Sequence, residues 1–248
     1  MDNPQPKLTP RPFWQHISIG VGLLLVATGV ANFDVAIIKA ADPAEWPGDL
    51  RRMFKLSELF AHGFGILLIV LGIWHLTPRR RKYIPRLLAC VVFPSITAHM
   101  IKLVVARRRP TSFLDQHMVP NWPDSSTATW PASEAEFAWN VQYASHSFPS
   151  AHAALVCGLA IGLSFIFPRG RTLFASMAVI AMMQRVIFFA HWPSDVVVGA
   201  SLGFLIAGGL VQQGWGIGWL CAKLESRGEN RLKVVSFEEE QLSVRKAA

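Results

Sequence analysis

The feature that most constrains the fold is a series of six apolar stretches, each close to the length that crosses a bilayer. A transmembrane helix needs about 20 mostly apolar residues, because the hydrocarbon core is about 30 Å thick. Only 16% of the 248 residues are charged, whereas soluble domains carry about 25%. We therefore predict an all-α fold, a polytopic membrane helix bundle with six transmembrane helices. The stretches run roughly over residues 17–38, 56–76, 84–105, 151–168, 172–190 and 193–211.

The distribution of Lys and Arg predicts the orientation of these helices. Cytoplasmic loops of membrane proteins are enriched in both residues. If the N-terminus is cytoplasmic, fifteen of the 24 Lys and Arg residues lie on that side, including the run at 79–82. We therefore expect both termini in the cytoplasm. Residues 1–222 would form the membrane domain, and residues 223–248 a charged cytoplasmic tail.

Charge and cysteine content bear on several other classes of protein. The net charge of +8 is compatible with nucleic-acid binding, but cytoplasmic Lys and Arg of a membrane protein account for it equally well. Cys90, Cys157 and Cys221 all lie in apolar stretches without metal-ligand spacing. They are typical of small buried hydrophobic residues, and not of disulfides or a zinc site. We expect no nucleic-acid partner.

Three polar clusters lie at the edges of the apolar stretches. They are residues 102–110 (KLVVARRRP), 147–152 (SFPSAH) and 185–195 (RVIFFAHWPSD). The orientation predicted from the Lys and Arg distribution brings all three clusters to the outer face. That prediction did not assume that the clusters lie together. This agreement indicates one composite site. Two outer segments, 39–55 and 106–150, flank it, and the second carries Trp residues typical of a membrane interface.

The first cluster pairs two cations. Lys102 and Arg109 are seven residues apart, which is two turns on the same face if the helix continues. Such a pair can clamp an anion, with Arg providing bidentate contacts and Lys a point charge. A lone lysine here can equally extend to the interface without a role. Arg107 and Arg108 are expected to face water or lipid headgroups.

The second cluster precedes an apolar helix. Ser150 is a favoured N-cap residue, and the free N–H groups of a first helical turn bind anions. Ala151 leaves that backbone accessible, and His152 in the same turn can donate a proton to a leaving oxygen. Taken alone, this cluster is explained as well by a capping serine and an interfacial histidine.

The third cluster contains Arg185, His191 and Asp195. Pro193 suits the first position of a helix, so Asp195 falls in the first turn and His191 just before it. The carboxylate would hold one ring nitrogen of His191 and leave the other nucleophilic. A structural His–Asp pair is the alternative. The three clusters together supply the cations, nucleophile and acid of phosphoryl transfer, with no acidic cluster suited to magnesium. We expect a reaction without metal or cofactor.

These residues resemble the motifs of the type 2 phosphatidic acid phosphatase (PAP2) family of membrane lipid phosphatases. The family pattern is K-x6-RP, then PSGH, then SR-x5-H-x3-D. Lys102, Arg109 and Pro110 match the first motif. In the second motif Ala151 replaces the glycine, and in the third Gln184 replaces the serine before Arg185.

The resemblance implies a role for each residue. His191 would attack phosphorus and form a phosphohistidine, oriented by Asp195, and His152 would protonate the departing alcohol. The remaining motif residues would hold the phosphate; these are Lys102, Arg109, Ser150, Ala151 and Arg185. We also regard four nearby residues as candidates that support the site or touch the headgroup: Glu58, His62, His99 and His146.

The sequence therefore predicts a membrane lipid phosphatase that acts at the outer face, in a bacterial inner membrane facing the periplasm. Candidate substrates are phosphatidic acid, phosphatidylglycerol phosphate, undecaprenyl diphosphate and lipid A phosphate. The partners would be this lipid and the bilayer, with no obligate protein partner evident. Two alternatives stay open, a lipid-to-lipid phosphotransferase using the same site and a transporter with a basic vestibule.

Overall fold

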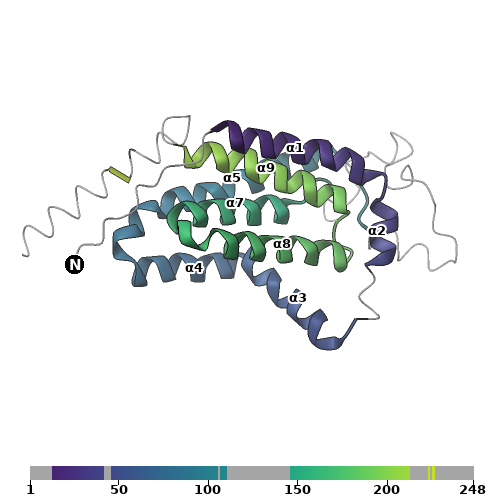
Figure 1. Cartoon of the computed structure of the whole chain (residues 1–248), viewed down its shortest axis with the longest axis horizontal. Coiled ribbons are helices and arrows are strands. Elements are labelled where there is room, and N and C mark those ends of the chain that lie inside the picture. Colours follow the sequence, from purple (N-terminus) through teal and green to yellow (C-terminus); the bar gives the residue numbers. More distant parts are fainter. Residues whose placement is uncertain are drawn as a thin grey trace, which may run out of the picture.

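The computed structural model describes residues 13–41, 46–105, 107–110 and 146–212, together with residues 223, 225 and 226. In this part of the chain the regular elements are helices, apart from one isolated bridge between Arg108 and His146. The prediction of an all-α fold is therefore confirmed (Figure 1). The helices are α1 (Phe13–Ala31), α2 (Asp34–Ala40), α3 (Gly48–Ala61), α4 (Gly63–Leu76), α5 (Ile84–Val104), α7 (Ala151–Ile166), α8 (Arg171–Ile187) and α9 (Pro193–Val211), with short 3-10 turns η2 (Pro78–Tyr83) and η6 (Pro168–Gly170).

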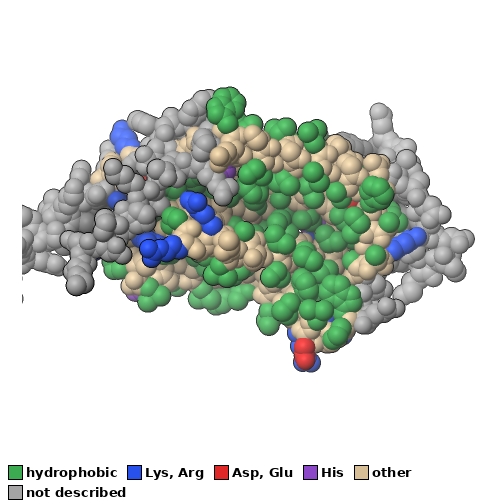
Figure 2. All heavy atoms as spheres, in the orientation of Figure 1, with side chains coloured by type: hydrophobic (Ala, Val, Ile, Leu, Met, Phe, Trp, Pro, Cys, Tyr) green, Lys and Arg blue, Asp and Glu red, His purple; other side chains and the backbone are tan. Residues whose placement is uncertain are grey.

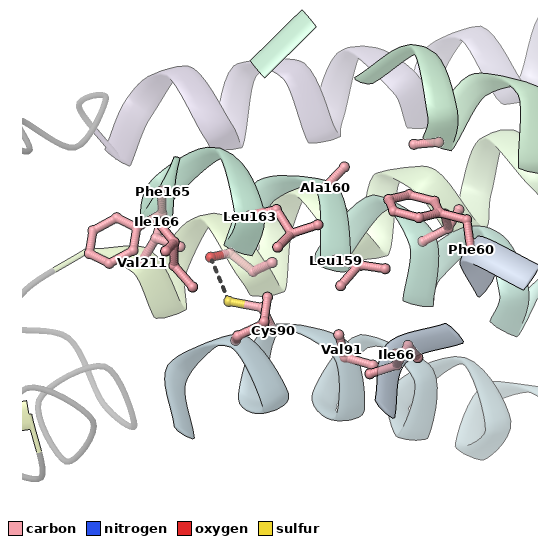
Figure 3. Close-up of a cluster of buried hydrophobic side chains, with 14 of the residues drawn as sticks. Phe60, Ile66, Cys90, Val91, Leu159, Ala160, Leu163, Phe165, Ile166 and Val211 are labelled. Carbon is pink, nitrogen blue, oxygen red and sulfur yellow. Dashed lines mark hydrogen bonds between the residues drawn. The ribbon is translucent and has the colours of Figure 1, made fainter. Parts of the chain in front are cut away.

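Helix α7 lies at the centre of the bundle. It packs against α5, α8 and α9, and α1 covers the other side of α9 (Figure 1). Most residues of α7 are buried, and Ala153, Ala154 and Leu159 have no exposed surface. Figure 3 shows how Cys90 and Val91 of α5 face Leu159 and other α7 side chains across this core. The segment that begins with Ala151 and His152 is therefore held rigidly by three neighbouring helices.

The outside of the bundle is apolar, as a membrane requires. Leucine, isoleucine, valine and phenylalanine side chains of α1, α4, α5 and α8 are exposed. Figure 2 shows hydrophobic side chains over most of the described part of the visible face, and Lys and Arg mainly toward its left-hand end. Exposed apolar area of this extent is stable in contact with lipid chains and not with water. The chain is an integral membrane protein.

The structure supports part of the predicted set of six spans. Among the described residues, three segments are long and apolar enough to cross a bilayer: Trp14–Ala31, Pro78–Val104 and Pro193–Val211. A fourth span exists if α3 and α4 count as one, although they meet at an angle of 64°. Helices α7 and α8 have only 16 and 17 residues. The expected continuous helix over 56–76 is wrong, because His62 has an extended backbone and ends α3.

The glycines of α9 serve contacts inside the chain. A Cβ on Gly199 would collide with the carbonyl oxygen of Ser150, and one on Gly203 would collide with Cys157 of α7. Both positions let α9 approach α7 more closely than any larger residue permits. The close approach at Gly199 joins the start of α7 to the start of α9.

A second set of polar contacts closes the opposite end of the bundle, where α5 begins and α9 ends. The Arg86 guanidinium is 1% exposed and forms an ion pair with Glu225, with N–O distances of 2.5 and 3.0 Å. Arg86 also donates to the carbonyl of Val211 at the end of α9. A residue beyond the helical bundle in sequence is therefore bound to its core.

Candidate active site

A cavity of 330 Å³ opens where α5 and α8 end and α7 and α9 begin. The three polar clusters of the sequence meet there. Ser150 and Asp195 lie directly behind its wall, each with no exposed surface. Of the residues predicted to act on phosphate, six line the cavity: Lys102, Arg109, Ala151, His152, Arg185 and His191.

Two of the cavity's cations come from the end of α5. Lys102 lies in the last turn and is only 4% exposed, and the Nδ1 atom of His146 is 3.0 Å from its backbone oxygen. Helix α5 stops at Val104, so the expectation that Lys102 and Arg109 share a helical face is wrong. Arg109 nevertheless lines the same cavity, and its guanidinium donates to the carbonyl of Ala190 at 3.1 Å.

The third cation, Arg185, ends α8 and is paired with a carboxylate of α3. Its guanidinium lies 2.7 Å from Glu58, and the amide of Gln184 lies 3.5 Å from the other oxygen of Glu58. Glu58 therefore fixes Arg185 at the rim of the cavity. His62 has a different role from Glu58, because its Nδ1 atom accepts from the N–H of Phe64 and caps α4. Both His62 and His99 line the cavity.

The start of α7 is a helix N-terminus capped by Ser150. The Ser150 hydroxyl accepts from the N–H of Ala153 at 3.3 Å, and the Ser150 N–H donates to the carbonyl of Asp195 at 3.1 Å. The sequence prediction that Ser150 caps this helix is confirmed. Ala151 has a helical backbone, and among the described non-glycine residues only Phe189 has a positive φ. Alanine in place of the motif's glycine therefore causes no backbone strain.

His191 lies in the loop between α8 and α9. Its Nδ1 atom is 3.8 Å from a carboxylate oxygen of Asp195 and 3.4 Å from the hydroxyl of Ser147. The same Asp195 oxygen accepts hydrogen bonds from Ser147 and from the N–H of Trp192. Pro193 begins α9 as predicted. Because Nδ1 faces this polar wall, Nε2 is the ring nitrogen available to the cavity.

Burial sets the protonation of His191, which lies outside the membrane-spanning helices. Loss of solvent lowers its pKa from 6.5 to about 4. The Asp195 carboxylate opposes this change, and the positive charges of Lys102 and Arg109 add to it. The imidazole is therefore neutral at physiological pH, with a free electron pair.

Sequence reasoning missed Arg107. It was expected to face water or headgroups, but it is 2% exposed and forms ion pairs with both Asp34 and Asp195. The chain turns inward after α5, which carries Arg107 into the interior and leaves Arg108 partly exposed. One signal was present, because Asp34 in an apolar stretch requires a buried partner.

Metal ligands are a separate question. Within the described residues, no group of three or more His, Cys, Asp or Glu side chains is placed to hold a metal ion.

The predicted outer segment 106–150 lies outside the described residues, apart from its two ends.

Comparisons with known proteins agree with this fold. A family model described as the PAP2 superfamily matches residues 83–219. The decaprenylphosphoryl-5-phosphoribose phosphatase of Mycobacterium tuberculosis is 33% identical over 180 residues, covering 68% of this chain and 84% of that protein. The lipid A 1-phosphatase of Rhizobium etli is 32% identical over 117 residues, covering 47% of this chain. The match spans only 44% of the length of the Rhizobium protein.

A solved structure shows a similar fold. It is a transmembrane PAP2-type phosphatidylglycerolphosphate phosphatase from Bacillus subtilis, with a TM-score of 0.53 at 19% identity, covering 80% of this chain and 94% of that one. Fold and site thus define a helical membrane protein with a cationic, histidine-containing cavity at one end of its bundle. The family match covers more than half of the sequence, and the chain belongs to the PAP2 superfamily.

Proposed function

We propose that this protein is a lipid phosphatase that hydrolyses the phosphate ester of a membrane lipid at the outer face of the membrane. One observation carries the proposal. Three cations, Lys102, Arg109 and Arg185, converge on the same cavity as two histidines, His152 and His191. Phosphoryl transfer needs positive groups around the phosphate, a nucleophile on one side and an acid on the other.

The cations and the start of α7 would bind the phosphate. Guanidinium groups of Arg109 and Arg185 suit bidentate contacts with phosphate oxygens, and Lys102 adds a point charge. Backbone N–H groups in the first turn of α7, beginning with Ala151, add the partial positive charge of a helix N-terminus. Arg185 would exchange part of its contact with Glu58 for the substrate, because that ion pair lies at the rim.

In the first chemical step Nε2 of His191 attacks phosphorus. The new N–P bond forms as the P–O bond to the lipid alcohol breaks, and the departing oxygen takes a proton from His152, which enters this step protonated because the bound phosphate dianion offsets the surrounding cations. The negative charge of Asp195 stabilises the His191 ring as it becomes positive. The product is a phosphohistidine and a free lipid alcohol.

In the second step a water molecule attacks the phosphohistidine. His152, now neutral, takes a proton from that water, the N–P bond breaks, and inorganic phosphate leaves. Both histidines return to their starting protonation. The cations carry the charge that a metal ion supplies in other phosphatases, so we propose that the reaction needs no metal.

The same proposal includes an orientation. The end of the bundle opposite the cavity carries the basic 3-10 turn η2, with Arg79–Lys82, and Arg169 of η6. Cytoplasmic loops collect such residues, which supports cytoplasmic termini and a cavity on the outer side. We propose six membrane passes, with α7 and α8 crossing as short helices inside the bundle, and a bacterial inner membrane with the site facing the periplasm.

The substrate class follows from the phosphate site and from the relatives. Proteins similar to this chain are named for lipid A, decaprenylphosphoryl-phosphoribose and phosphatidylglycerolphosphate. Their shared element is a phosphomonoester close to the membrane surface. We propose a lipid monophosphate as substrate, with diphosphates and the four lipids predicted from the sequence as the panel to test.

Phosphate release from that panel by purified protein tests the proposal. Wild-type protein should release inorganic phosphate from at least one lipid, and His191→Ala should release none while unfolding at the same temperature. His75→Ala, at an exposed position of α4, is the matched control and should remain fully active. Full activity in the His191 variant would refute the proposed mechanism, and transfer of the phosphate to a second lipid would identify a phosphotransferase.

A chelator experiment tests the metal-free reaction separately. Activity should be unchanged after purification in excess EDTA, because protein cations supply the positive charge. Loss of activity that added magnesium restores would contradict this part of the proposal.

A further inference from the structure

Behind the cavity, four buried polar side chains form a continuous chain of contacts that ends at His191. They come from distant parts of the sequence, and none is more than 2% exposed. In order of contact, leading to His191, they are Asp34, Arg107, Asp195 and Ser147. Each such group costs free energy to bury, which the fold accepts only where partners compensate for lost solvent.

Arg107 is the centre of this chain. One guanidinium nitrogen lies 2.7 Å from Asp34 and the other lies 2.5 Å from Asp195, so a single cation bridges two carboxylates. Ser194 joins both sides, since its hydroxyl contacts Asp34 and accepts from Arg107 at 2.8 Å. The Ser194 N–H also donates to Asp34 at 2.9 Å. Asp34 therefore fixes Arg107 from one side while Asp195 contacts it from the other.

The two oxygens of Asp195 have separate tasks. Oδ1 binds Arg107, which leaves Oδ2 to accept from Ser147 and from the N–H of Trp192. The Ser147 hydroxyl lies closer to His191 Nδ1, at 3.4 Å, than the carboxylate does, at 3.8 Å. Ser147 therefore bridges the Asp195 carboxylate and the His191 ring.

We propose that Arg107, anchored by Asp34, is a positioning residue that fixes the Asp195 carboxylate, and that Ser147 transmits this position to His191. Nδ1–H of His191 donates to the Ser147 hydroxyl, which donates to Asp195. This arrangement holds the tautomer with a free Nε2 and presents Nε2 to the phosphate. The inference rests on the proposed function, because it assigns support to the nucleophile of that reaction.

The structure explains why a cation is needed at this depth. Asp195 has no exposed surface, and an unpaired carboxylate there would be strongly destabilised or would take up a proton. A protonated or rotated Asp195 could no longer orient Ser147 and His191. Arg107 keeps Asp195 ionised, and Asp34 prevents Arg107 from swinging toward the cavity, where phosphate would bind it.

The test compares Asp34→Asn, Arg107→Gln and Ser147→Ala with wild-type protein in detergent. Each should lower kcat about 10- to 100-fold, the range for loss of an outer partner that orients a functional histidine. KM and inhibition by inorganic phosphate should stay unchanged, since none of these residues lines the cavity. Asp34→Asn and Ser147→Ala change few atoms, so they remain informative if Arg107→Gln fails to fold.

Two control variants remove similar buried contacts far from the site. Ser201→Ala removes a buried hydroxyl of α9 that donates to Gly20 at 2.7 Å, and Glu225→Gln weakens the buried ion pair with Arg86. Both should lower the unfolding temperature yet keep the kcat of the folded protein. A merely structural role for Arg107 and Ser147 would produce this same pattern.

The acid side of the pH profile gives a second readout. Without Arg107, the buried Asp195 takes up a proton more readily, and its negative charge no longer favours the imidazolium form of His191. The acid limb of kcat/KM should therefore move to lower pH in Arg107→Gln and stay in place in both controls. Unchanged kcat and an unmoved limb in all three variants would overturn the inference, whereas an active His191→Ala variant would overturn the proposed function itself.

Discussion

His191 experiences opposing electrostatic influences. Burial and the cations Lys102 and Arg109 favour its neutral form, and the Asp195 carboxylate favours the protonated one. The neutral form prevails, as a nucleophile requires. In the proposed mechanism, attack on phosphorus makes the ring positive, and Asp195 and the phosphate then stabilise it. Such a site would suit the transition state better than the resting enzyme.

The first prediction concerns pH. Because the pKa of His191 is lowered from 6.5 to about 4, its free base persists through mildly acidic pH and is lost only as the pH falls through about 4. The acid limb of kcat/KM should therefore lie near pH 4, after correction for the separately titrated phosphate of the substrate. A limb near 6.5 after that correction would show that His191 is not in this environment.

The same shift affects stability in a defined direction. A histidine with a lowered folded pKa binds fewer protons in the folded state than in the unfolded state. Its contribution to stability is present above pH 6.5 and is lost as the pH falls from 6.5 toward 4.

The second prediction concerns the three converging cations. Without a bound anion they repel one another, so Lys102→Met should keep or raise the unfolding temperature while weakening inhibition by inorganic phosphate. Lys39→Met, at an exposed position of α2, is the matched control and should change neither property. Phosphate inhibition unaltered in Lys102→Met would show that this lysine does not bind the anion.

At this scale the sequence predicted some residues and missed others for clear physical reasons. Lys102, His152 and His191 were found because chemistry-bearing residues at helix edges follow a spaced motif. Arg107 was misplaced because its burial depends on where α5 ends. The role of Ser147 arises from a contact of 3.4 Å that no local pattern encodes.

Among the elements, the junction of α7 and α9 determines the site's geometry. Helix α7 supplies His152 and α9 supplies Asp195, and the Ser150 N–H bound to the Asp195 carbonyl fixes their relative register. Gly199 permits this contact, because its missing side chain leaves room for the Ser150 carbonyl. The relative position of His152 and Asp195 therefore depends on close packing at Gly199.

The third prediction tests that junction. Gly199→Ala places a methyl group against the Ser150 carbonyl and should destabilise the protein by about 1–3 kcal/mol through overpacking. It should also lower kcat by displacing the first turn of α7. Gly72→Ala in α4 is the matched control, since nothing lies within 4 Å of the added carbon. Equal activity and melting temperature in both variants would contradict this account of the junction.

Four helices were predictable from the sequence to within about three residues of their ends, whereas the break between α3 and α4 was not. Apolar length and flanking Pro and Arg residues correctly indicated α5, α7, α8 and α9. The break at His62 was missed because the sequence from Ser57 to Leu76 stays apolar enough for one helix. Gly65 permits the bend locally, because a Cβ there would collide with the Leu59 carbonyl. Contacts of Glu58 with Arg185 and of Lys55 with the Phe188 ring join α3 to α8.

On the scale of the whole molecule, the two ends of the bundle differ in chemistry. One end holds the cavity with its buried acids and histidines, and the other exposes a basic surface around Arg79 and closes on the Arg86–Glu225 pair. This asymmetry predicts the orientation in the membrane, because the basic end stays in the cytoplasm.

The fourth prediction is a labelling pattern. Single cysteines at two exposed positions, Arg51→Cys on α3 and Arg79→Cys in η2, should react differently with a membrane-impermeant maleimide. Position 51 should label in intact cells, and position 79 only after the membrane is permeabilised. The reverse pattern would place the cavity in the cytoplasm and contradict the proposed orientation.

The central claim is that His191 carries the phosphoryl group. The most direct measurement stops turnover of a 32P-labelled lipid by denaturing the enzyme in alkali, without an acid quench. These conditions preserve phosphohistidine, and peptide mapping then locates the label. The account predicts label on His191 in wild-type protein and none in His191→Ala. Label on another residue, or phosphate release by His191→Ala at the wild-type rate, would contradict it.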